Sequence, residues 1–154
     1  MIIPRRLLAK GFAFVFGVLL LCVSVSSGFA AELNISIIAG THGEVVKPAV
    51  TVDKVENLAG IKLAMTYDQK TLKFIKAEKT SYTANMLYVL NSKEPGKLII
   101  VMAAAKGFAG ENAELVEIFF ELLKDVKEQD KVTLQITEAE LMGDDLQRIE
   151  IKFH

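Results

Sequence analysis

The chain has 154 residues, with 18 Lys or Arg against 19 Asp or Glu, so its net charge is −1. This length suits one modest domain or two at most, and the charge balance gives no basic surface for nucleic acid. Apolar residues make up 51% of the chain but are unevenly distributed, because 20 of the first 30 residues are apolar.

Residues 1–30 are predicted to be a secretory signal peptide. Arg5, Arg6 and Lys10 form a positive start, an uncharged apolar stretch follows, and small residues lead to a cleavage point after Ala30. The uncharged run 11–31 is also long enough to span a bilayer, so an uncleaved anchor is the alternative and the one expected route to membrane contact. Both alternatives predict an exported body in the periplasm, at the cell surface or outside the cell.

The remaining segment, 31–154, is predicted to be one domain without cysteine, because Cys22 is the only cysteine of the chain. This excludes disulfides, cysteine-ligated metals and a thiol nucleophile from that segment. Three of the 18 basic residues also precede Ala31, which leaves 15 basic residues against 19 acidic ones and a net charge of −4.

Short stretches of alternating apolar and polar residues dominate this segment, as is typical of half-buried β-strands. The predicted strands are 33–37, 45–55, 61–67, 72–79, 98–105, 116–122, 132–136 and 149–153. The apolar stretch 86–90 suits either a further strand or a helical turn. The composition of 113–126 would also suit a helix, but the alternation over 116–122 favours a strand.

The connections between these strands complete the prediction. Residues 56–60 and 107–110 are expected to be loops, and Pro48 suits an edge strand or a bulge. The continuous apolar run 98–105 is expected to be a central strand that is covered on both faces. Eight or nine short strands without an amphipathic helix between them predict an all-β protein, an antiparallel β-sandwich.

Residues that could carry chemistry are sparse. His42 lies in a predicted turn and His154 ends the chain, whereas a catalytic triad or zinc site needs histidine held by packed neighbours. Asp144 and Asp145 lack the spacing of a calcium loop and suit a solvated turn. We therefore predict no catalytic residue, no metal and no cofactor, with a small hydrolase as the alternative from another class.

Aromatic residues bear on whether the protein binds sugar, because sugar C–H faces pack on exposed rings. The chain has no Trp. Outside the predicted core faces it offers only Tyr82, Tyr88, Phe108 and Phe119. Four scattered rings offer little surface for stacking on sugar, so a carbohydrate-binding or adhesion module is the alternative to a module that binds protein.

Several blocks, taken in order, resemble the cohesin domain family. They are GEVVKPAVTV at 43–52, NLAGIKLAMTYD at 57–68, LKF at 72–74, the stretch 110–122, and ITEAELMGDDLQRIEI at 136–151. The resemblance covers nearly all of 33–153, although Gly60 and Lys62 stand where the family often has Asn or Asp. It implies a nine-stranded jelly-roll sandwich that binds dockerin modules and so helps to assemble polysaccharide-degrading enzymes.

We therefore predict a non-catalytic binding module whose partner is a dockerin-like protein module, or alternatively a polysaccharide. Phe119 alternates outward, and an exposed Phe on a sheet face can anchor a protein partner; the alternative is that the loop 80–91 covers it. The strand that contains Ala64 is expected to share this face. The predicted partner-binding residues are Lys62, Ala64, Thr66, Glu117, Phe119 and Glu121.

Overall fold

The computed structural model describes residues 30–131 and 134–153, and within these ranges the regular elements are all strands. The strands are β1 (Ala31–Ile35), β2 (Val45–Val46), β3 (Ala49–Tyr67), β4 (Leu72–Lys79), β5 (Leu87–Asn91), β6 (Lys97–Leu122), β7 (Leu134–Met142), β8 (Arg148–Ile149) and β9 (Ile151–Phe153). The predicted signal peptide lies outside the described residues up to position 29, as do His154 and residues 132–133.

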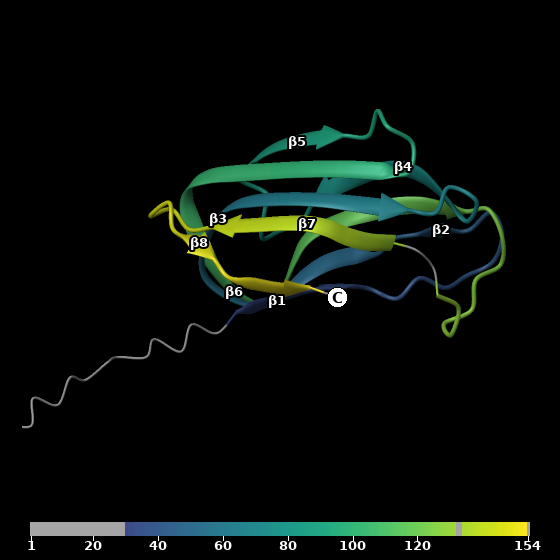
Figure 1. Ribbon diagram of the computed structural model, residues 1–154, viewed down its shortest axis with the longest axis horizontal. Coiled ribbons are helices and arrows are strands. Elements are labelled where there is room, and N and C mark those ends of the chain that lie inside the picture. Colours follow the sequence, from purple (N-terminus) through teal and green to yellow (C-terminus); the bar gives the residue numbers. More distant parts are fainter. Residues whose placement is uncertain (1–29, 132–133, 154) are drawn as a thin grey trace, which may run out of the picture.

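Two long strands build both layers of the molecule (Figure 1). β3 has 19 residues and β6 has 26, and the two bend together halfway along. The first layer contains β5, the first part of β6, the second part of β3, β7 and β8. The second layer contains β4, the second part of β6, β2 with the first part of β3, β1 and β9. The strand pairs are antiparallel except β1 with β9, which confirms the predicted all-β sandwich.

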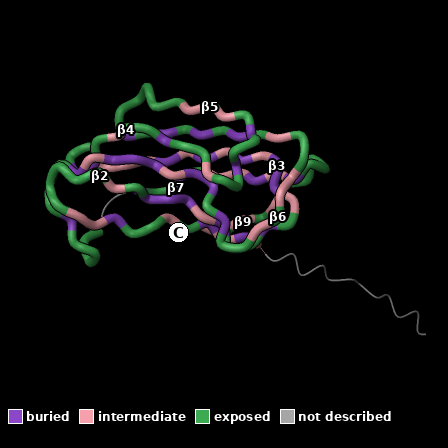
Figure 2. The backbone as a smooth tube through the Cα atoms, turned by 180° about the vertical axis from the view of Figure 1, so that it is seen from behind, coloured by how far each residue is buried: buried purple, intermediate pink, exposed green. Residues whose placement is uncertain are grey.

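The core lies between these layers because each half of a long strand turns alternate residues inward. In β3, Ile61, Leu63 and Met65 are at most 2% exposed. In β6, Phe120 is fully buried and packs against the rings of Tyr67 and Phe74, with centroids 5.1 and 6.0 Å apart. Figure 2 shows buried backbone running through the middle of the molecule, with exposed segments around it.

Three local predictions are wrong, for related reasons. Residues 56–60 and 107–110 are not loops; they are the bends of β3 and β6. Register shifts between Val55, Leu58 and Gly60 allow the two paired strands to bend there without separating. The run 98–105 is a central strand with only one covered face. Leu98 and Ile100 are fully buried, whereas Ile99 and Val101 are each 40% exposed. The ambiguous stretch 86–90 contributes most of the strand β5.

Candidate binding face

The outer side of the first layer is an open sheet surface built from β5, β6, β3 and β7, with the two-residue β8 at its rim, which we call the open face. Its strand register places three rows of side chains across it. The rows are Leu87–Ala103–Gly60–Met142, Val89–Val101–Lys62–Glu140 and Asn91–Ile99–Ala64–Glu138. Since neighbours directly across a sheet share a face, these residues form one continuous surface.

The half of the open face over β5 and β6 is apolar. Leu87 is 78% exposed and Val89 is 64% exposed. Val89 lies directly opposite Val101 and diagonal to Ile99, and Leu87 lies diagonal to Val101; Ile99 and Val101 are each 40% exposed. These four side chains, which we call the apolar patch, carry no polar atom that water could satisfy. A contiguous apolar patch on a protein surface marks an interaction site more often than a single exposed hydrophobic residue does.

The half of the open face over β3, β7 and β8 is charged but internally paired. Lys62 Nζ donates to Glu138 Oε1 at 2.7 Å, and Arg148 Nη2 donates to Glu140 Oε1 at 3.3 Å. The hydrogen bond to Glu138, and then its negative charge, raise the pKa of Lys62. Each positive charge of this half therefore has an acidic partner on the same surface.

The six sequence-predicted residues fall into two separate groups. Lys62, Ala64 and Thr66 point outward from the second part of β3, on the open face. Glu117, Phe119 and Glu121 lie in the second part of β6, beside β4 and the strands β2 and β3 of the second layer. The expectation that both groups share one face is wrong, because the bends of β3 and β6 assign them to different layers.

Phe119 is only 9% exposed although it points away from the core. The ammonium groups of Lys47 and Lys76 lie 5.1 and 4.5 Å from the centre of its ring. Lysine stems pack along apolar surface while their charged ends stay in water, and the ammonium is attracted to the ring face. Two lysines therefore stand over this ring, which is largely covered and is not the exposed anchor that alternation predicted.

The remaining candidates have structural partners. His42 is exposed, and its backbone N–H donates to Asp125 Oδ1 at 2.8 Å. Asp144 accepts from Asn57 Nδ2 at 2.8 Å and from the Gly107 N–H at 3.1 Å. Within the described ranges, no cluster of three or more His, Cys, Asp or Glu residues is arranged to hold a metal ion.

The aromatic residues do not line up along the open face. Tyr82 stacks obliquely on Phe108 at 5.7 Å, and Tyr88 donates its hydroxyl to the Ala77 carbonyl at 3.0 Å. Burial, followed by the charge of Glu78, raises the pKa of Tyr88. A hollow near the start of β1, lined by residues such as Asp53, Asn57 and Arg148, has no aromatic residue in its walls.

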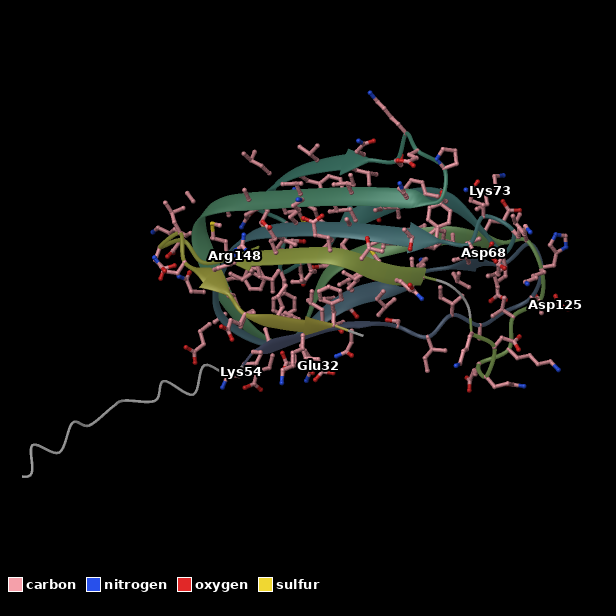
Figure 3. All side chains as sticks on the ribbon, in the orientation of Figure 1. Glu32, Lys54, Asp68, Lys73, Asp125 and Arg148 are labelled. Carbon is pink, nitrogen blue, oxygen red and sulfur yellow. The ribbon has the colours of Figure 1, made fainter. Side chains whose placement is uncertain are left out.

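The sequence signals missed the apolar patch. The run 98–105 is apolar throughout, so its pattern could not show that every second residue faces solvent, and 86–90 was ambiguous. In Figure 3, side chains project from both sides of the first layer, and Arg148 lies at one end of this layer. In the part of the chain that the structure describes, no helix is long and apolar enough to cross a membrane.

Comparisons with known proteins agree with this architecture. The family model of the cohesin domain matches residues 31–150, while no curated protein matches the chain. The sixth cohesin of Acetivibrio cellulolyticus scaffoldin B, solved with a Cel5 dockerin mutant, superposes with a TM-score of 0.71 at 17% identity, covering 81% of this chain and 94% of that one.

Two further cohesin structures are similar in the same way. A cohesin in a type I cohesin–dockerin complex from Clostridium thermocellum has a TM-score of 0.68 at 15% identity, over 81% of this chain and 89% of the other. A non-cellulosomal cohesin from Archaeoglobus fulgidus has a TM-score of 0.65 at 16% identity, over 80% and 86%. These likenesses establish the shared sandwich fold, and the family match establishes membership. The chain belongs to the cohesin family.

Proposed function

We propose that this protein is a non-catalytic recognition module that binds a dockerin-like protein module on its open face. The observation that carries the proposal is the apolar patch of Leu87, Val89, Ile99 and Val101, which no other part of the described chain covers. The cohesins of the Acetivibrio and Clostridium structures were solved with dockerins, so a protein partner of that class fits a member of the same family.

Burial of the apolar patch supplies the driving force for binding. Full burial of one Val, Leu or Ile side chain is worth about 1.5–3 kcal/mol, and the residues of the patch are still 40–78% exposed. The internally paired charges beside it, Lys62 with Glu138 and Arg148 with Glu140, need no counter-charge from the partner. A partner that presents apolar side chains to this surface is therefore favoured over a polar glycan.

A matched pair of substitutions tests this placement. Val101 and Val45 are exposed to similar extents, 40% and 47%, but lie in different layers. Calorimetric titration with dockerin modules from the same organism is expected to show at least about a tenfold loss of affinity for Val101→Lys, because a charge would be desolvated in the interface. Val45→Lys is expected to bind like the parent protein.

Two results of these titrations would contradict the proposal: no binding to any dockerin, and equal losses of affinity in both variants. A separate test on a polysaccharide column would contradict it if the parent protein is retained and competing dockerin does not prevent the retention. The last result would instead support the alternative of a carbohydrate-binding or adhesion module.

We further propose that the protein is exported and acts in polysaccharide breakdown or in cell-surface assembly. The charged start, the apolar stretch and the small residues before Ala31 support this proposal. N-terminal sequencing of protein recovered from the culture is expected to begin at Ala31. Recovery of the intact chain from the membrane fraction would favour the uncleaved anchor, and recovery from the cytoplasm would contradict export.

A further inference from the structure

β5 forms one rim of the first layer, with no described strand beyond it (Figure 1). It pairs only with β6, over five residues and without a register shift. Lys79 Nζ donates to the carbonyl oxygens of Ala84 and Met86, both at 2.9 Å. The part of this edge whose backbone groups no described side chain occupies therefore begins at Leu87, the first residue of β5. An edge of this kind offers unpaired N–H and C=O groups to another strand.

This edge lacks the features that normally prevent strand addition. Native edge strands are usually interrupted by charge, proline, a bulge or shortness. β5 has the sequence LYVLN, with none of these. By contrast, β4 carries Lys73, Lys76, Glu78 and Lys79 and a register irregularity, and β7 carries Glu138 and Glu140 and a register irregularity. The other rims are short, because β8 has two residues including Arg148 and β9 has three residues including Lys152.

We propose that β5 pairs antiparallel with β5 of a second copy of this chain, on a two-fold axis through Val89. In this register Val89 faces Val89 of the other copy and Leu87 faces Asn91. Because the strand is uncharged, the pairing brings no like charges together. A second copy fits better than an unrelated strand because both sides then present the same uncharged, five-residue edge.

The pairing closes on itself and leaves the open face free. The opposite rim of the first layer is β7, with the two-residue β8 at its end. This rim carries Glu138, Glu140 and Arg148 and a register irregularity, so the joined sheets do not continue into a fibre by the same contact. Side chains stand perpendicular to the sheet, so Leu87 and Val89 stay on the outer surface while their backbones pair. The dimer would present two open faces side by side and could bind two partner modules, which raises avidity.

Cysteine cross-linking tests the proposed register in a Cys22→Ser background, where no other cysteine exists. Directly opposed residues of an antiparallel pair have Cα atoms about 4.5–5.5 Å apart, within reach of a disulfide. Val89→Cys is therefore expected to give a covalent dimer on mild oxidation. Leu87→Cys, at a position even more exposed than Val89, is expected to give at least about tenfold less, since the two Leu87 positions would lie roughly 13 Å apart.

Sedimentation of the full protein supplies the second measurement. The parent is expected to show a concentration-dependent dimer, and Val89→Lys is expected to be monomeric because two ammonium groups would meet on the axis. Ile99→Lys places the same charge one strand further in and is expected to leave the dimer intact. A monomeric parent, equal cross-linking of both cysteine variants, or loss of the dimer in Ile99→Lys would each overturn the proposal, the last by indicating face-to-face association. None of these measurements uses a dockerin, so their failure is distinct from failure of the proposed function.

Discussion

At the scale of single residues, Asp144 connects three parts of the chain that are far apart in sequence. It lies in the turn between β7 and β8, and its two carboxylate oxygens accept from Asn57 in β3 and from the Gly107 N–H in β6. The hydrogen bond from Gly107, followed by that from Asn57, lowers the pKa of Asp144. Hydrogen bonds from Lys70 and Thr71 lower the pKa of Asp68 in the same way.

Stability is therefore expected to decrease in acid. A carboxyl whose pKa is lower in the folded state stabilises the fold above its unfolded pKa, about 3.9 for Asp, and this contribution is lost as the pH falls through the folded pKa. Urea denaturation at several pH values is expected to show Asp144→Asn as less stable than the parent at pH 7, with the difference narrowing as the pH falls below about 3.9. A constant difference across this range would contradict the assigned role of the carboxylate.

Phe119 gives a second prediction at this scale. Two lysine side chains stand over its ring, outside the core between the layers, so Phe119→Ala is expected to lower the free energy of unfolding by about 2 kcal/mol, less than the 3–5 kcal/mol expected for Phe120→Ala in the core. Chemical denaturation of both variants measures this. The role of Phe119 as a partner anchor stays a prediction, and unchanged stability together with weakened dockerin binding would support it.

At the scale of elements, the two bends of β3 and β6 determine which residues share a surface. They lie against each other where Leu58 pairs with Phe108, and the neighbouring Gly107 leaves no room for a side chain. A Cβ atom added at Gly107 would lie 2.9 Å from the Asn57 carbonyl carbon and would also collide with the Asn57 side chain. Glycine is required here because two backbones approach closely.

Gly107→Ala is therefore expected to destabilise the protein by about 1–3 kcal/mol through steric strain. Combining it with Asn57→Ala removes the side-chain part of the collision but not the backbone part. The double variant is thus expected to be more stable than the sum of the single effects implies, as measured by a double-mutant cycle in urea. Strict additivity would show that the two residues do not interact.

At the scale of the whole molecule, charge is distributed differently from what the composition suggests. The segment 31–154 carries a net charge of −4, yet the charges of the open face are joined in the pairs Lys62–Glu138 and Arg148–Glu140. Exposed pairs of this kind contribute about 0–1 kcal/mol and are screened by salt. The apolar patch, in contrast, does not depend on ionic strength in this way.

Binding on the open face is therefore expected to depend weakly on salt. Titration with the dockerin that binds best is expected to give dissociation constants within about threefold of each other between roughly 0.1 and 0.5 M NaCl. Lys62→Ala is expected to change this affinity by less than about 1 kcal/mol. A steep loss of affinity with salt would indicate that unpaired charges, and not the apolar patch, govern recognition.

The sequence by itself determined the strand content, the sandwich class and the inward-facing residues such as Leu63 and Phe120, because a period of two is a local property of the chain. It could not determine which outward residues lie together. Alternation separates Lys62 and Phe119 from the core but does not say in which layer each lies. That depends on the bends at 56–60 and 107–110, which long-range contacts such as those of Asp144 with Asn57 and Gly107 stabilise. Only the tertiary structure exposed Ile99 and Val101, because a run that is apolar on both faces gives no signal of which face remains uncovered.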